Sequence, residues 1–182
     1  MKKFLILILF FSNLSWALPE QSSFDISERL SERVDFWTKI YSYYTTSQGV
    51  FHLVDDPSFI LGEIDITSIN TNSILSSGEK QKRINKLIKS KRAEFISKWK
   101  ISDPKSVRLQ MGLKDRMQKA LFLSGRYLPM MESIFKKNDL PPELTRIVFV
   151  ESSFNVFAQS KVGASGLWQI MPSVAIFYCF IH

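Results

Sequence analysis

The segment from Glu151 to Pro172 constrains this 182-residue chain more than any other. It begins with a carboxylate near a predicted helix end, continues through small polar residues, and contains two glycines and a Trp-Gln pair. Gly163 and Gly166 allow positive φ angles and a close approach of the backbone to a ligand, which favours an ordered turn. No Asp or Glu follows Glu151, so any acid chemistry in this segment falls on that one residue.

Glu151 is predicted to lie on the apolar face of a short helix. A double proline breaks the preceding helix and places Pro142 in the first turn of a new one. The spacing that follows puts Glu151 on one face with the side chains of Leu144, Ile147 and Val148. A carboxylate placed there is partly desolvated, which favours its protonated form and suits a general acid for a glycosidic oxygen. The same spacing fits a residue that ends the helix and faces water, and the pattern alone does not separate the two.

The side chains that follow Glu151 favour a sugar ligand. Sugars combine flat apolar faces with many hydroxyl groups, and the segment offers apolar, aromatic and hydrogen-bonding side chains to match: Ser152, Ser153, Leu167, Trp168 and Gln169. Asn155 and Ser160 are residues that stabilise turns. Each residue also has a structural alternative, since a tryptophan such as Trp168 more often belongs to the core than to a binding platform.

Hydrophobic periodicity predicts a mainly helical chain with a small strand-like region. We expect strands over residues 50–54 and 60–66, a loop over 67–77, and helices over 25–45, 79–100, 102–124 and 127–137. A capping residue followed by proline at Ser102-Asp103-Pro104 predicts the start of the third helix, and Gly125 predicts its end. The basic helix before it could lie on a membrane surface, but packing against its neighbour is favoured because another amphipathic helix follows.

The N-terminal residues predict an exported chain. Two lysines, the apolar run over residues 4–11 and the small residues Ser15 and Ala17 are typical of a cleaved signal peptide, and the run is too short for a membrane anchor. The formal net charge is +7 and stays positive without the first 17 residues, which suits a polyanionic partner such as a bacterial wall. Export argues against a nucleic-acid partner. The single cysteine, Cys179, excludes an intramolecular disulfide, and His52 lacks the Cys/His neighbours of a metal site.

The order of residues after Glu151 resembles the catalytic domain of the soluble-lytic-transglycosylase (SLT) family, and within it the membrane-bound lytic murein transglycosylase D branch. The family pattern is Glu-Ser, an aromatic residue and Asn, then Ala and Ser, then Gly-Ala-x-Gly-Leu-(Met or Trp)-Gln-x-Met-Pro. It is met here by Glu151, Ser152, Phe154, Asn155, Ala158, Ser160, Gly163, Ala164, Gly166, Leu167, Trp168, Gln169, Met171 and Pro172. The resemblance covers about residues 105–173, including the lead-in over 126–129 and 140–144.

This resemblance implies a mainly α, lysozyme-like fold that acts on peptidoglycan glycan strands in the periplasm or cell envelope. It implies cleavage between N-acetylmuramic acid and N-acetylglucosamine, with Glu151 acting first as acid and then as base, so that a 1,6-anhydro sugar forms without water. Ser152 and Gln169 become the candidate substrate contacts and Met171 a groove-lining residue. The resemblance implies no metal and no cofactor, and it leaves the oligomeric state open.

The chain departs from the family after Pro172. Family members continue with further helices, whereas residues 174–182 here are almost wholly apolar, which predicts a truncated, incomplete C-terminus. We expect a signal peptide over residues 1–17, a helical N-terminal region over 18–104, and a partial lysozyme-like domain over 105–182. Two alternatives stay open: a non-catalytic remnant that at most binds glycan, and a lysozyme-type hydrolase that uses water.

Overall fold

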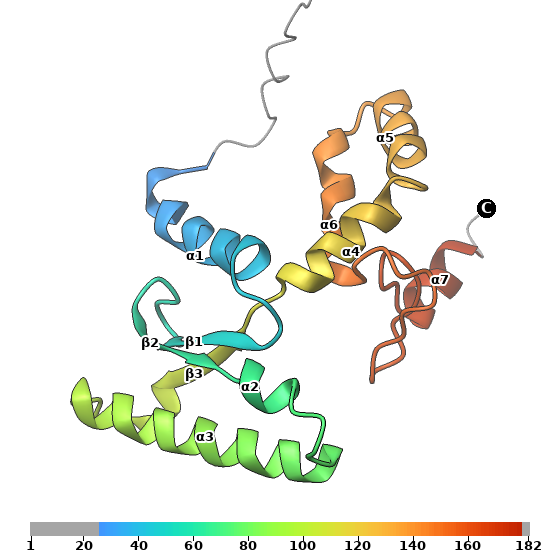
Figure 1. Cartoon of the computed structure of the whole chain (residues 1–182). Coiled ribbons are helices and arrows are strands. Elements are labelled where there is room, and N and C mark those ends of the chain that lie inside the picture. Colours follow the sequence, from blue (N-terminus) through green and yellow to red (C-terminus); the bar gives the residue numbers. More distant parts are fainter. Residues whose placement is uncertain (1–25, 180–182) are drawn as a thin grey trace, which may run out of the picture.

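The computed structural model describes residues 26–179, so the predicted signal peptide lies outside the described residues. Figure 1 shows two units joined at α4: a sheet flanked by α1 and α3, and a helical unit that ends at α7. The elements in chain order are η1 (Glu28–Leu30), α1 (Ser31–Ser42), β1 (Gln48–Leu53), β2 (Ile60–Asp65), α2 (Thr67–Asn70), α3 (Ser77–Lys98), η2 (Pro104–Ser106), β3 (Val107–Met111), α4 (Lys114–Ser124), α5 (Leu128–Lys137), η3 (Pro142–Arg146), α6 (Ile147–Glu151) and α7 (Pro172–Cys179).

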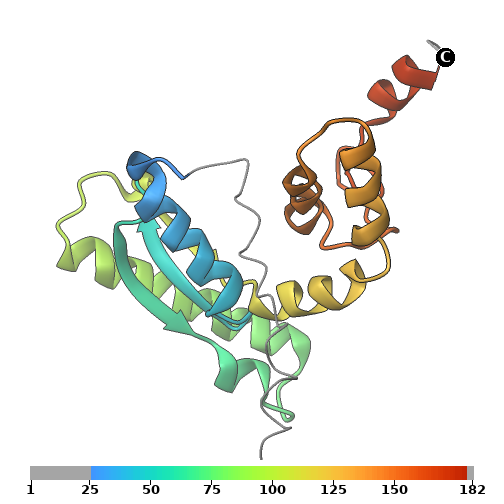
Figure 2. The ribbon, with the colours of Figure 1, turned by 90° about the horizontal axis from the view of Figure 1, so that it is seen from above.

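The sheet has three antiparallel strands in the order β2-β1-β3, with β1 at the centre. The side chains of consecutive residues of β1 point to opposite faces of the sheet. Both faces are buried, because α1 covers one and α3 covers the other. Val50 packs with Phe36 and Ile40 of α1, whereas Phe51 packs with Phe95 of α3. Figure 2 shows the same layering from above, with the sheet between the two helices. The predicted strands over 50–54 and 60–66 are confirmed.

Helix α3 begins with a capping box that satisfies backbone donors at its N-terminus. The Ser76 hydroxyl accepts a hydrogen bond from the Glu79 N–H, and the Glu79 carboxylate accepts one from the Ser76 N–H at 2.9 Å. The prediction of a helix over 79–100 is therefore confirmed, with a start two residues earlier. Gly62 of β2 allows the close approach of this helix, because a Cβ there would lie 2.2 Å from the Phe95 ring.

The helix predicted from Ser102-Asp103-Pro104 is wrong in its first half. Asp103 accepts a hydrogen bond from the Lys105 N–H as a cap, but the turn that it starts ends at Ser106. Residues 107–111 then form strand β3, whose backbone pairs with β1. Residues 107–111 were predicted to belong to the domain over 105–182, but they lie in the sheet of the first unit. The region over 18–104, predicted as helical, contains the strands β1 and β2 as well. The predicted helix end is confirmed, since α4 ends at Ser124 with Gly125 as its cap.

The start of α4 is hydrogen-bonded to the first residue of β1 and to the segment that leads from α1 into it. The Gly112 N–H donates to the Gln48 carbonyl at 2.7 Å, and the Lys114 N–H donates to the Tyr44 carbonyl at 3.0 Å. The Asp115 carboxylate accepts hydrogen bonds from the Thr46 hydroxyl at 2.6 Å and the Thr46 N–H at 3.0 Å, which lower the pKa of Asp115. These contacts fix the direction in which α4 leaves the sheet.

The far end of α4 belongs to a second core, built from the buried residues Met131, Val148 and Phe154. Leu123 of α4 packs against it, so one helix contributes to both units. The prediction of a mainly helical chain is confirmed. Among residues 26–179, no helix has the length and apolar character needed to cross a bilayer.

Candidate active site

Glu151 is the last residue of α6, and its side chain is exposed. The expectation that it is partly desolvated on the apolar face is therefore wrong for this structure, and the alternative of a helix end that faces water holds. The physical reason is that α6 is only five residues long. Val148, which has no exposed surface, takes the inward position of its last turn, and Phe154 fills the core just beyond the helix. The Glu151 side chain is left exposed at the end of the helix.

The backbone reverses sharply directly after Glu151. Ser153 and Phe154 have φ angles of 53° and 58°, a left-handed backbone conformation that residues other than glycine rarely adopt. Burial holds this conformation in place, since Phe154 is only 1% exposed and its ring meets that of Phe149 edge-on at 4.6 Å. Two such residues in succession commonly persist only where the surroundings enforce them, often at functional sites. The Asn155 N–H donates to the Ser152 carbonyl at 3.1 Å across the reversal, which brings these two residues together directly after Glu151.

The loop over residues 155–170 is held by its own hydrogen bonds. The Asn155 side-chain oxygen accepts from the Phe157 N–H at 3.1 Å, and the Ser160 hydroxyl accepts from the Ala164 N–H at 2.9 Å. Both residues stabilise turns, as predicted. Gly163 and Gly166 have φ angles of 94° and 74°, so the prediction of positive φ at these positions is confirmed as well.

The Gln169 side chain closes this loop. Its Nε2 atom donates to the Ala158 carbonyl at 3.2 Å and to the Gly166 carbonyl at 3.0 Å, joining the two ends of the turn. Gln169 itself has a φ of 49°, so its backbone adopts the left-handed conformation that these contacts help to maintain. A structural role for Gln169 was missed by sequence reasoning, which assigned it only to the substrate; its contact with the substrate stays a prediction.

We expect Gln169→Glu to loosen the loop, because the carboxylate oxygen that replaces Nε2 cannot donate to the two carbonyls. The loss should be about 1–3 kcal/mol in the free energy of unfolding, the net contribution of two hydrogen bonds, because each carbonyl keeps a backbone N–H donor. Gln159→Glu, at an exposed position of the same loop, is the matched control for the added charge. Urea unfolding with tryptophan fluorescence measures both, and equal midpoints for the two variants would contradict this role of Nε2.

Trp168 and Met171 occupy different surroundings. The Trp168 ring stacks on Phe135 of α5 at 5.7 Å, with 8° between the planes, and packs against the second core. The alternative that Trp168 is a core residue therefore holds. Met171 is 36% exposed between the loop and α7, and beyond it the apolar side chains of Val174 and Ile176 are exposed as well.

The predicted site residues fall into two groups. Ser152 follows Glu151 and lines a pocket of about 340 Å³ together with Arg116, Lys119, Leu123, Ser153 and Asn155. Gln169 and Met171 lie on the loop and do not line this pocket. The sequence prediction did not include Arg116 and Lys119 of α4 in the site. Their spacing of three residues on a predicted helix was a signal that they share one face.

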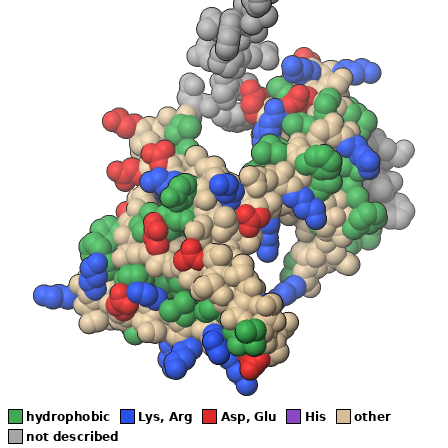
Figure 3. All heavy atoms as spheres, in the orientation of Figure 1, with side chains coloured by type: hydrophobic (Ala, Val, Ile, Leu, Met, Phe, Trp, Pro, Cys, Tyr) green, Lys and Arg blue, Asp and Glu red, His purple; other side chains and the backbone are tan. Residues whose placement is uncertain are grey.

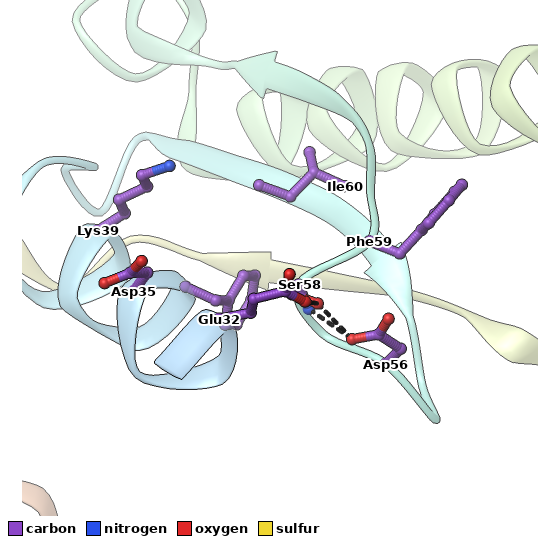
Figure 4. Close-up of a pocket in the computed structure, with 8 residues that line it drawn as sticks. Glu32, Asp35, Lys39, Asp56, Ser58, Phe59 and Ile60 are labelled. Carbon is purple, nitrogen blue, oxygen red and sulfur yellow. Dashed lines mark hydrogen bonds between the residues drawn. The ribbon is translucent and has the colours of Figure 1, made fainter. Parts of the chain in front are cut away.

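An acidic hollow lies in the other unit, between α1 and the turn that joins β1 to β2. Glu32, Asp35 and Asp56 line it, and Asp56 accepts hydrogen bonds from Ser58 (Figure 4). These bonds lower the pKa of Asp56. Over residues 26–179 no group of three or more His, Cys, Asp or Glu side chains is arranged to hold a metal ion. His52 is buried and its ring lies 5.0 Å from that of Phe36.

Comparison with known proteins finds a similarity within the helical unit. Residues 129–177 match the family model described as "Transglycosylase SLT domain", a stretch that contains Glu151, Ser152, Gln169 and Met171. A curated protein of Alteromonas sp. (strain M-1), "Putative tributyltin chloride resistance protein", is 40% identical over 52 residues, which cover 29% of this chain and 25% of that protein. No solved structure matches the chain. The helical unit and the family match together confirm the predicted fold class, a mainly α, lysozyme-like domain.

Proposed function

We propose that this chain acts as a peptidoglycan lytic transglycosylase that cleaves the β-1,4 bond between N-acetylmuramic acid and N-acetylglucosamine. The family match indicates transglycosylase-type activity toward peptidoglycan in general. The observation that carries the finer proposal is the position of Glu151: one exposed carboxylate at the end of α6, followed by a left-handed reversal of the backbone and by Ser152, Ser153 and Asn155, which line a pocket. The lead-in over residues 126–129 and 140–144 supports assignment to the membrane-bound lytic murein transglycosylase D branch.

One carboxylate suffices for this reaction because the substrate supplies the nucleophile. Retaining and inverting glycosidases need two carboxylates that flank the bond. Here the protonated Glu151 gives its proton to the leaving oxygen of N-acetylglucosamine as the bond to C1 breaks. The carboxylate that remains takes the proton of the muramyl C6 hydroxyl, whose oxygen closes on C1. Glu151 ends protonated again, and the products are a free 4-hydroxyl and a 1,6-anhydro end, with no water consumed.

A glycan that lies over Glu151 displaces the water that surrounds this exposed side chain in the free protein. Exclusion of water from the carboxyl group favours its protonated form, which the first step requires. The rigid backbone after Glu151 limits the movement of its neighbours while the proton is transferred, and positioning of this kind contributes substantially to catalysis. Ser152 and Gln169 are the proposed substrate contacts, and Met171 is proposed to line the groove that accepts the glycan.

Mass analysis of the released products tests this proposal. We expect purified peptidoglycan sacculi incubated with the full chain to release muropeptides with anhydro ends. A lysozyme-type hydrolase would instead give reducing ends, heavier by one water, because water would replace the C6 hydroxyl. Release of no fragments, with binding to the sacculi retained, would favour a non-catalytic glycan-binding role. Either result would overturn the proposed reaction.

The proposed substrate lies in the cell envelope, so the chain must reach it. We propose that it is exported and acts in the periplasm or at the envelope, with glycan strands as its partner. The apolar run and small residues over positions 4–17 support this route.

A further inference from the structure

The pocket beside Glu151 has a basic wall on α4. Arg116 and Lys119 are exposed, lie three residues apart on one helix face, and line the pocket of about 340 Å³. An adjoining pocket of about 500 Å³ shares Lys119 and adds Arg126 and the ring of Phe157, which is 90% exposed. We call these two pockets, along α4 and residues 152–157, the α4 groove. Figure 3 shows basic side chains gathered near the junction of the two units.

The opposite wall of the α4 groove carries hydroxyl groups that are available to a ligand. Ser152 Oγ lies 3.5 Å from the Val148 carbonyl, and Ser153 Oγ lies 3.4 Å from the Phe149 carbonyl. Both distances exceed the usual range for a hydroxyl donor, so neither contact holds its hydroxyl firmly. Glu151 itself does not line either pocket, but both serines directly follow it in the chain, so the groove begins one residue beyond the proposed catalytic position.

The basic residues of the α4 groove are not used to stabilise the fold. Among the described residues, ion pairs join Lys91 to Glu94 and Arg146 to Glu132, and neither of these two pairs involves Arg116 or Lys119. The adjacent carboxylate of Asp115 is directed to Thr46 instead. Exposed cations without a carboxylate partner, in a pocket that also offers hydroxyls, form a site suited to an anion.

We propose that the α4 groove binds the carboxylates of the peptide branches that peptidoglycan carries on its muramyl residues. This inference rests on the proposed function and adds a second point of recognition beside the glycan. The planar guanidinium of Arg116 matches a carboxylate through two parallel hydrogen bonds, and Lys119 adds a mobile point charge. Ser152 and Ser153 suit the amide groups of the same peptide. A branch held there fixes which sugar lies over Glu151.

Binding measurements with two forms of glycan strand test this proposal. The full chain carrying Glu151→Gln binds without turnover, so its affinity can be compared for strands with intact peptides and for strands from which an amidase has removed them. We expect tighter binding to the peptide-bearing strands. Arg116→Gln with Lys119→Gln should lower that affinity about tenfold, the effect of losing a charge-assisted hydrogen bond, and leave binding to bare strands unchanged.

The matched control removes the same charges at the same spacing from α3. Arg83 and Lys86 are exposed there, and Arg83→Gln with Lys86→Gln should bind both strand types as the unmodified protein does. Arg116→Glu with Lys119→Glu should reverse the preference toward bare strands. Equal affinity for both strand types, or an equal loss on both in the α4 variant, overturns the inference and leaves the proposed function intact. Failure to bind either strand overturns both.

Discussion

Glu151→Gln is expected to abolish release of muropeptides from purified peptidoglycan while leaving the fold intact. The amide cannot give up a proton to the leaving oxygen or take one from the C6 hydroxyl, so both proposed steps fail. General acid–base catalysis contributes roughly 10²–10⁴-fold, and activity should fall by at least that factor. Because the Glu151 side chain is exposed, the free energy of unfolding should change by no more than about 0.5 kcal/mol.

Asp139→Asn is the matched control for this experiment. Asp139 is an exposed carboxylate in the same helical unit, between α5 and η3, with a φ of 55° that asparagine also tolerates. Its replacement should leave the rate of muropeptide release unchanged. Substantial activity in Glu151→Gln would exclude Glu151 as the catalytic acid, and loss of activity in Asp139→Asn would indicate a second carboxylate and thus a hydrolase of ordinary type.

Phe154→Ala is expected to be the most destabilising single change in the helical unit. The ring is almost completely buried and packs edge-on against Phe149, so its removal leaves a cavity in the second core. Replacement of a buried phenylalanine by alanine costs about 3–5 kcal/mol, a large part of the roughly 5–15 kcal/mol that stabilises a typical domain. Urea unfolding monitored by tryptophan fluorescence should show a clearly lowered midpoint.

Phe157→Ala separates the effect of burial from that of removing an aromatic ring. Phe157 lies three residues later and is 90% exposed, so its replacement should change the free energy of unfolding by less than about 0.5 kcal/mol. Similar midpoints for the two variants would contradict the assignment of Phe154 to the core. Such a result would also remove the support that burial gives to the left-handed backbone after Glu151.

The amino-acid pattern predicted the positions of those elements that have strong periodicity and clear end signals. The long basic helix, both strands of the first hairpin and the turn residues Asn155, Ser160, Gly163 and Gly166 lie where they were predicted. Strand β3 was missed because a proline cap starts only one turn there, and because its side chains are fixed by pairing with β1, a tertiary interaction. Local signals do not reveal pairing of this kind.

The surroundings of Glu151 were not predicted correctly, and its catalytic role stays a prediction. Helical spacing placed it on the apolar face, but spacing does not reveal that α6 ends after five residues and that Phe154 returns to fill the core. Gln169 illustrates the same limit, since its hydrogen bonds to Ala158 and Gly166 depend on the folded loop. The basic residues of α4 were visible in the sequence, but only the fold brings them beside Ser152.

Helix α4 starts in hydrogen bonds with the segment that joins α1 to β1 and ends against the core that contains Phe154, so one helix belongs to both units. A ligand that binds the folded protein but not the unfolded chain raises the stability of every part that must be folded for binding. If the α4 groove binds its proposed ligand, occupation would therefore stabilise the first turn of α4 and, through Asp115 and Thr46, the segment that leads into β1 of the sheet. The sheet thereby becomes thermodynamically linked to the state of the site, although it provides none of the proposed catalytic or substrate-binding residues.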